Sequence, residues 1–376
     1  MYSSGCPLHS VTQSREPRDQ KQIYNRKYTL KNNTDVLSNN EEMADELMDV
    51  LNEQRNNSYI KTVNINPNNY SFFLCSEEQI EDVEKFCCSE RRDNIVLSVD
   101  TTFNLCNLWT TDTSYRNRRL INPRTNDHPV FLGPVLLHFS KDANIFNRLA
   151  LEMLSFNSNI INLKRVRVDM EGAIFNGIKN LIKNLERLLC AEHLSDRDKE
   201  KIINLLAKTS QTGNEKRKST KEIIADIYGK KYGAVLEYGL GDSSDSTDFE
   251  AKLNSLKDKW SSLCPGFFGW FLKRRKDLFI NGVIESARKS TGVAGLYYQS
   301  DIESLHFIEK MNLCYKTVGV IELIRSLKKI VERQKDEETQ ALYGGGPYVL
   351  ADSYKSYLVD GAKRHTRWSL EMRKSH

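Results

Sequence analysis

The sequence predicts an α/β fold, in which a mixed β-sheet is covered by helices on both faces and carries a mostly helical insertion. Closely spaced β-branched, apolar segments begin at residue 94, and apolar segments of helical period alternate with strands from residue 141. Strand patterns then nearly vanish between residues 195 and 290. The chain has 376 residues, of which 39% are hydrophobic and 28% charged, as in a globular protein with polar termini and inserts.

The strongest pattern predicts three strands in succession, followed by strands that alternate with helices. The expected strands are 95–100, a segment within 103–115, 129–139, 165–169 and 187–191, and the expected helices are 141–156 and 171–185. An antiparallel opening followed by alternating strands and helices matches the ribonuclease H-like arrangement.

The rest of the chain is expected to be organised around this core. The predicted parts are an N-terminal flanking region (1–93), the first part of the core (94–194), the helical insertion (195–290), the last core helices (291–335) and a C-terminal tail (336–376). The flanking region is expected to be partly disordered, because its first 40 residues or so are polar and lack apolar periodicity. A helix is predicted at 41–54, and another at 316–335.

Charge and cysteine content narrow the cellular setting. The formal net charge of +5 suits a polyanionic partner without requiring one. Eight scattered cysteines do not resemble a secreted disulfide framework, and no repeated Cys-x-x-Cys pair indicates a zinc finger. No signal peptide and no apolar run of about 18 residues is evident, so no membrane partner is expected. The nucleus or the cytosol is the predicted compartment.

Two carboxylates end predicted strands, and a third lies on a predicted helix. Asp100 and Asp169 stand where open α/β sheets place reacting groups, and Glu303 follows the insertion. Such oxygen ligands suit a pair of Mg²⁺ or Mn²⁺ ions, which can promote in-line attack on a phosphodiester. For a single Asp at a strand end, a turn or a helix cap is the alternative interpretation.

The segments around these carboxylates resemble the catalytic domain of Mutator-like element (MULE) transposases. The matching segments are Ser98-Val-Asp-Thr-Thr-Phe-Asn-Leu, Val168-Asp-Met-Glu-Gly-Ala-Ile, Cys190-Ala-Glu-His and Ser300-Asp-Ile-Glu-Ser-Leu-His. They occur in the family's order and cover about residues 94–310. The long interval between Asp169 and Glu303 accommodates the helical insertion that is typical of these enzymes.

The resemblance implies a DDE transposase with a ribonuclease H-like fold. Asp100, Asp169 and Glu303 would hold two divalent ions and direct cleavage and transfer of double-stranded DNA at transposon ends, in a homo-oligomer or a single chain. The zinc-finger-type domain that usually precedes this core is not visible in residues 1–93. A fragment, or a catalytically inactive or domesticated DNA-binding or regulatory protein, is therefore the alternative. Another nuclease of the same fold is a third hypothesis.

Four further residues are candidates for supporting roles near the carboxylates. Cys190 and His193 match the family's Cys-x-x-His element, which is thought to shape the site; a buried cysteine with a hydrogen-bonded histidine is the simpler interpretation. Glu171 is equally explained by the dipole of the helix that it begins. His306 lies one turn after Glu303 and could approach a metal or a phosphate, or be an ordinary, partly buried histidine.

A cluster of aromatic and basic residues within the insertion is a candidate for DNA binding. Its members are Trp270, Lys273, Arg274, Arg275 and Lys276. Basic side chains contact phosphates and aromatic rings can stack on bases, but a solvated helix surface beside core aromatics has the same pattern. The run from Lys216 to Lys218 could contribute charge or act as a nuclear import signal.

Overall fold

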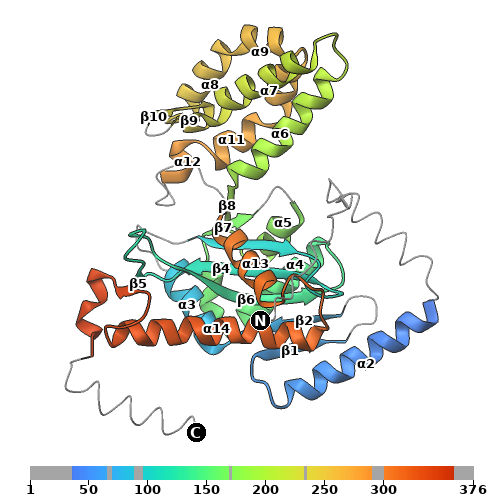
Figure 1. Ribbon diagram of the computed structural model, residues 1–376, viewed down its shortest axis with the longest axis vertical. Helices are drawn as coiled ribbons and strands as arrows, with labels where there is room; N and C mark the ends of the chain where they lie inside the picture. Colours follow the sequence, from blue (N-terminus) through green and yellow to red (C-terminus); the bar gives the residue numbers. More distant parts are fainter. Residues whose placement is uncertain are drawn as a thin grey trace, which may run out of the picture. The chain divides into compact units, whose positions relative to one another are not determined.

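The computed structural model describes residues 36–65, 70–88, 96–168, 172–232, 235–289 and 300–359. The chain divides into two compact units, residues 1–52 and 53–376. Most of helix α2 (Val36–Gln54), which includes the helix predicted at 41–54, belongs to the first unit. The second unit contains the β-sheet and the other helices and strands that the structure describes (Figure 1).

A seven-stranded mixed sheet forms the centre of the second unit. Its strands, in spatial order, are β1 (Ile60–Asn64), β2 (Ser71–Leu74), β6 (Val130–His138), β4 (Trp109–Arg116), β3 (Leu97–Thr102), β7 (Arg165–Val168) and β8 (Glu186–Leu189). The pairs β3–β7 and β7–β8 are parallel, and the other pairs are antiparallel. The predicted α/β class with a mixed sheet is therefore confirmed. The strand order is compatible with a ribonuclease H-like fold but is not specific to it.

The sheet also includes two strands from the region that precedes the predicted core. β1 and β2 pair antiparallel, and β2 continues the sheet beyond β6 (Figure 1). All four residues of β2 are buried, and Phe72 and Phe73 point to opposite faces. A strand that is buried on both faces has no alternating pattern, so local periodicity does not predict it.

Helices cover both faces of the sheet. Leu97 and Val99 of β3 belong to the same apolar core as α4 (Ala143–Phe156) and α5 (Gly172–Leu181). The alternate residues of β3 point to the other face, where α13 (Ser300–Asn312) packs across β3, β4 and β6. The sheet thus separates an apolar layer from a layer that contains polar groups.

Shorter helices and a long C-terminal helix complete the region around the sheet. The capping box of α3 (Glu77–Val83) includes Gln79, whose amide also donates to the carbonyls of Leu132 and Gly133 on β6. Helix α14 (Val320–Leu342) extends past the predicted end at 335. The remaining short elements are the π-helix Glu84–Cys88, the 3₁₀-helices Ser158–Asn162 and Asp352–Tyr357, and the paired strands β5 (Leu120–Ile121) and β11 (Val349–Leu350). Part of the predicted tail is therefore folded.

The segment predicted as an insertion is mostly helical. It consists of α6 (Ala191–Leu206), α7 (Gly213–Tyr228), the hairpin β9 (Lys230–Tyr232) and β10 (Val235–Glu237), the 3₁₀-helix Leu240–Asp242, α8 (Ser246–Ser255), α9 (Lys257–Leu263), α10 (Phe267–Arg274), α11 (Lys276–Gly282) and α12 (Glu285–Lys289). These helices enclose an apolar core of their own, in which Trp260, Phe267 and Phe271 are fully buried. Among the helices that the structure describes, none is long and apolar enough to cross a membrane.

Candidate functional site

Asp100 and Asp112 lie side by side on adjacent strands at the centre of the sheet. They are directly opposite each other in the antiparallel register of β3 and β4, so both side chains point to the face that α13 covers. The side chain of Asp112 is completely buried, whereas that of Asp100 retains 17% of its exposure. Asp100 is thus the member of this pair that solvent or a ligand can reach.

Helix α13 presents a mixed face to these carboxylates. The spacing of Ile302, Leu305, His306 and Glu309 places them on one side of the helix, and all four are buried. The imidazole Nε2 of His306 lies 3.0 Å from Asp112 Oδ2, and its Nδ1 lies 3.8 Å from Asp100 Oδ2. His306 therefore bridges the buried and the accessible carboxylate.

The environment of His306 favours its protonated form. Burial by itself lowers the pKa of His306, but the hydrogen bond to Asp112 and the charges of Asp112 and Asp100 outweigh it and raise the pKa. A protonated imidazole donates from both nitrogens. The charge of His306 thus stabilises the two carboxylates at the position where they would otherwise repel each other.

The environment of Glu309 favours its neutral form. It is 1% exposed, and burial together with the charge of Asp112 raises its pKa well above the ordinary value for a glutamate. Within the described residues, neither of its carboxyl oxygens has a hydrogen-bond partner, and the same is true of Asp112 Oδ1. The hydroxyl of Tyr59 is also buried, and burial raises its pKa well above the ordinary value. The layer beneath α13 therefore contains several polar atoms with unused hydrogen-bonding capacity.

This unused capacity is compatible with a bound cation. Asp112, His306 and Glu309 can each offer one ligand atom, and these atoms lie within 4.8 Å of one another. Two carboxylates and an imidazole form a mixed oxygen and nitrogen set that suits Mn²⁺ or Zn²⁺ better than Mg²⁺, which prefers oxygen ligands. Protons on His306 and Glu309 are the alternative means of balancing the charge.

The predicted metal ligands are placed to different extents. Asp100 lies in the second half of β3, and β7, its parallel neighbour, ends at Val168. Asp169 and Glu171 follow directly and lie outside the described residues. Glu303 is on α13, one turn before His306, and is exposed.

The Cys-x-x-His element lies where β8 leads into the insertion. Cys190 is 1% exposed and is the residue before the first turn of α6. His193 is in the first turn of α6, and its side chain is outside the described set. The buried thiol is consistent with the simpler interpretation of this cysteine as a core residue.

The aromatic and basic cluster of the insertion is divided between core and surface. Arg275 is buried, forms a 2.6 Å ion pair with Asp198 and lies over the ring of Trp270. Lys276 is partly buried and pairs with Glu250. The other two basic residues of the cluster, Lys273 and Arg274, are exposed. Arg275 therefore stabilises the insertion, and the exposed pair retains the chemistry needed to contact phosphates.

Sequence reasoning missed Asp112 and Glu309, although each left a signal. Asp112 is the only charged residue between Trp109 and Tyr115 in a strand of threonines and serine, and a charge in such a strand is unusual. Glu309 occupies a position on α13 where the spacing of Ile302 and Leu305 calls for an apolar residue. A charged residue at a position that the pattern assigns to the core is a marker of a buried site.

Comparison with known proteins does not identify a family. A scan against protein-family models and a search of curated proteins each returned no significant match. The resemblance to Mutator-like transposases thus remains a prediction that depends on the four short segments.

Proposed function

We propose that this chain is a DDE-type DNA transposase domain with a ribonuclease H-like fold, in which Asp100, Asp169 and Glu303 bind two Mg²⁺ or Mn²⁺ ions. The observation that carries the proposal is the parallel pairing of β3 and β7 within the sheet. Because parallel strands end at the same edge, the half of β3 that contains Asp100 and the end of β7 at Val168 lie together. Asp169 is the next residue in the chain.

The sheet order supports the same proposal. Strands β6, β4, β3, β7 and β8 are neighbours in this order, with the first three antiparallel and the last three parallel. The first strand of the predicted core thus becomes central, as a ribonuclease H-like arrangement requires. Helix α13, which carries Glu303, packs across β3, β4 and β6 after the helical insertion.

Each residue near this edge would have a distinct task. Asp100, Asp169 and Glu303 would supply the negative oxygens that hold the ions. Divalent ions bound there would polarise the phosphodiester and lower the pKa of the attacking water or 3′ hydroxyl. The Nδ1 of His306 lies 3.8 Å from the carboxylate of Asp100 and would orient it. The hydrogen bond between Nε2 of His306 and Asp112 holds the imidazole in place. This chemistry needs no side chain as a nucleophile.

Metal binding tests the proposal directly. Isothermal titration with Mn²⁺ would compare the wild type with the double variant Asp100→Asn, Asp169→Asn and with Asp258→Asn, which changes an exposed carboxylate on α9. We expect the double variant to lose at least about tenfold in affinity and the control to match the wild type. Nicking of duplex DNA would then be measured for the single alanine variants of Asp100, Asp169 and Glu303. Metal-dependent nicking that survives in all three would contradict the proposal.

A second candidate is a non-catalytic DNA-binding or regulatory protein derived from a transposase. The observation that favours it is the exposure of Glu303, on the same helix whose buried face carries His306 and Glu309. This candidate predicts salt-sensitive binding of DNA that is unchanged by the carboxylate substitutions, without nicking in any variant.

A further inference from the structure

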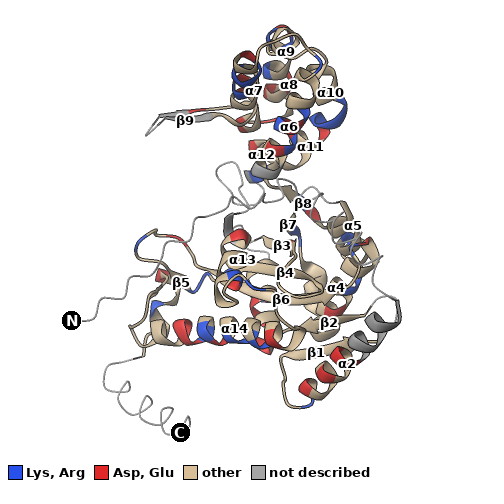
Figure 2. Cartoon of the chain, turned by 45° about the vertical axis from the view of Figure 1, so that its right-hand side comes forward, with Lys and Arg blue, Asp and Glu red and all other residues tan. Residues whose placement is uncertain are grey.

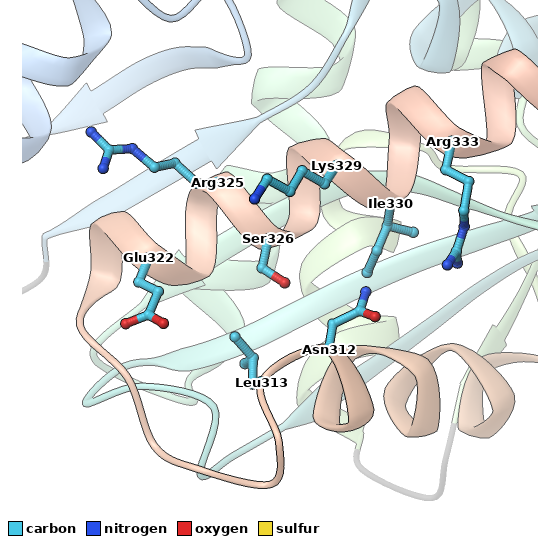
Figure 3. Close-up of a pocket in the computed structure, with 8 residues that line it drawn as sticks. All are labelled: Asn312, Leu313, Glu322, Arg325, Ser326, Lys329, Ile330 and Arg333. Atoms are coloured by element: carbon cyan, nitrogen blue, oxygen red, sulfur yellow. The ribbon is translucent and has the colours of Figure 1, made fainter.

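A groove of about 600 Å³ lies between the end of α13 and the first half of α14 (Figure 3). Three basic residues of α14 line it, Arg325, Lys329 and Arg333, and all three are exposed. Asn312 from α13 and Ser326 from α14 add neutral polar groups to its walls. None of these residues belongs to the carboxylate site.

We propose that this groove binds the phosphate backbone of duplex DNA. The inference rests on the proposed function in one respect, because it takes DNA as the polyanion that the chain meets. The spacing of Arg325, Lys329 and Arg333 places successive side chains one turn apart on a single face of α14. Eight residues of helix span about 12 Å, and a DNA duplex carries about seven phosphate charges over that length. The row of cations is therefore long enough to contact two or three phosphates.

Two of these three cations can readily exchange their present partners for phosphates. Arg325 donates to both carboxyl oxygens of Glu53, at 2.7 and 3.3 Å, so it is the most firmly held of the three, although 61% of its side chain is exposed. Arg333 approaches Glu337 only to 4.0 Å. An ion pair as long as that of Arg333 contributes little free energy, so it competes weakly with a polyanion. Among the described residues, Lys329 makes no ion pair, and its ammonium group remains available.

The opposite wall does not repel an anion strongly. The last carbonyl oxygens of a helix carry a partial negative charge, and unpaired ones at the end of α13 would repel an anion in the groove. However, backbone carbonyl oxygens in this last turn already accept hydrogen bonds: that of Glu309 accepts from the N–H of Leu313, that of Met311 from Cys314 and that of Lys310 from Tyr315. Cys314 and Tyr315 adopt the positive φ angles that such a helix ending requires.

The carboxylate of Glu322 limits where an anion can bind in the groove. Glu322 lines the same groove one turn before Arg325, and Figure 2 shows that acidic and basic residues alternate along α14. The anion is therefore expected to sit toward Lys329 and Arg333, away from Glu322. Asn312 is six residues after His306, which corresponds to about 9 Å along α13. A backbone held in the groove would thus run close to the carboxylate site.

The test measures DNA affinity in EDTA, so that neither metal binding nor cleavage contributes. Fluorescence anisotropy with a duplex of about 25 base pairs would be recorded at several salt concentrations for the wild type and for Lys329→Gln, Arg333→Gln. The matched control is Lys208→Gln, Lys257→Gln, which removes the same charge from exposed positions in the insertion. Surface substitutions of this kind change the unfolding free energy by no more than about 0.5 kcal/mol.

Each phosphate contact contributes about 0.9 to the slope of log affinity against log salt. We expect the slope of the groove variant to fall by about two relative to the wild type, and that of the control to fall by less than half as much. A third variant, Glu322→Gln, is expected to bind DNA more tightly than the wild type, while Asp258→Asn leaves the affinity unchanged. Equal slopes for the groove variant and its control would overturn the inference.

The outcomes separate this inference from the proposed function. Loss of slope in the groove variant, with no nicking by any form of the protein, would support the groove and contradict the transposase proposal. Intact nicking in a groove variant whose DNA affinity equals that of the control would support the transposase proposal and contradict the groove. A loss caused by Lys273→Gln, Arg274→Gln alone would place the DNA on the insertion and also overturn the inference.

Discussion

Replacing Glu309 by leucine is expected to stabilise the protein. The carboxyl group of Glu309 is 1% exposed, and within the described residues both its oxygens are without a hydrogen-bond partner. Burying an unsatisfied polar group costs about 1–3 kcal/mol. Leucine has a similar volume and no polar atom, so Glu309→Leu is predicted to raise the free energy of unfolding by about that amount at pH 7. Such a gain raises the melting temperature by about 1–2 °C per kcal/mol in a chain of 376 residues.

The stabilisation by Glu309→Leu is expected to increase with pH. The pKa of Glu309 is raised well above the value of 4.5 that applies in the unfolded chain, mainly because of burial. Between the two pKa values the unfolded state binds fewer protons than the folded state, so this group lowers the stability as the pH rises above 4.5. Glu309→Leu removes that loss, and the advantage of the variant is expected to grow from pH 4.5 upward.

The assay is urea unfolding in EDTA at pH 5, 7 and 9, with Glu309→Gln as the matched control. Glutamine keeps the shape and the polar atoms but cannot ionise, so it should match the wild type at pH 5 and exceed it at pH 9. A loss of more than about 1 kcal/mol in the leucine variant at pH 7 would refute the reasoning, because it would mean that the carboxyl group makes a stabilising contact.

Repeating the assay with Mn²⁺ tests the cluster of Asp112, His306 and Glu309 as a cation site. A ligand that binds only the folded state stabilises it in proportion to the logarithm of its concentration. Stabilisation of the wild type by Mn²⁺ that is absent in Glu309→Leu would identify a bound cation. The same response in both proteins would show that protons balance the charge of the cluster.

Three further predictions concern the surrounding structure. Burial lowers the pKa of His138 from 6.5 to about 4. About 3 kcal/mol of stability that is present above pH 6.5 should therefore be lost as the pH falls through 4. Urea unfolding of the wild type and of His138→Asn at pH 7 and pH 4 measures this loss. Gly177→Ala would place its Cβ 2.5 Å from a backbone oxygen of α4, and thermal unfolding should report a cost of about 1–3 kcal/mol. Asp198→Ala should cost about 3–5 kcal/mol in urea unfolding because it leaves the guanidinium of Arg275 buried without its partner, whereas the exposed Asp196→Ala should cost less than about 1 kcal/mol.

Most of the core sheet could be predicted from local patterns. The segments that became β3 and β6 are rich in apolar and β-branched residues, and β7 alternates arginine with valine. Each lies within its predicted range or extends it by one or two residues. Helix α4 is marked by its apolar spacing and by Asp142, whose carboxylate accepts from the backbone of the first turn. These signals depend on neighbours in the sequence, so they can be recognised without the tertiary structure.

The residues that surround Asp100 could not be predicted in the same way. Asp112 meets Asp100 only because β3 and β4 pair in one register, and a shift of one residue would turn its side chain to the other face. His306 contacts Asp112 across 194 residues, a contact that depends on how α13 packs after the insertion. The same holds for Arg275, whose partner Asp198 lies 77 residues away.

The sequence by itself thus determined the α/β class, the position of Asp100 within a strand and the presence of a helical insertion. Only the tertiary structure decided that Asp112, His306 and Glu309 form a buried group behind Asp100, and that the basic residues of α14 line a groove. The physical reason is the range of the forces involved. Hydrophobic periodicity and helix capping act over a few residues, whereas burial, strand register and the charges that shift a pKa depend on segments that only folding brings together.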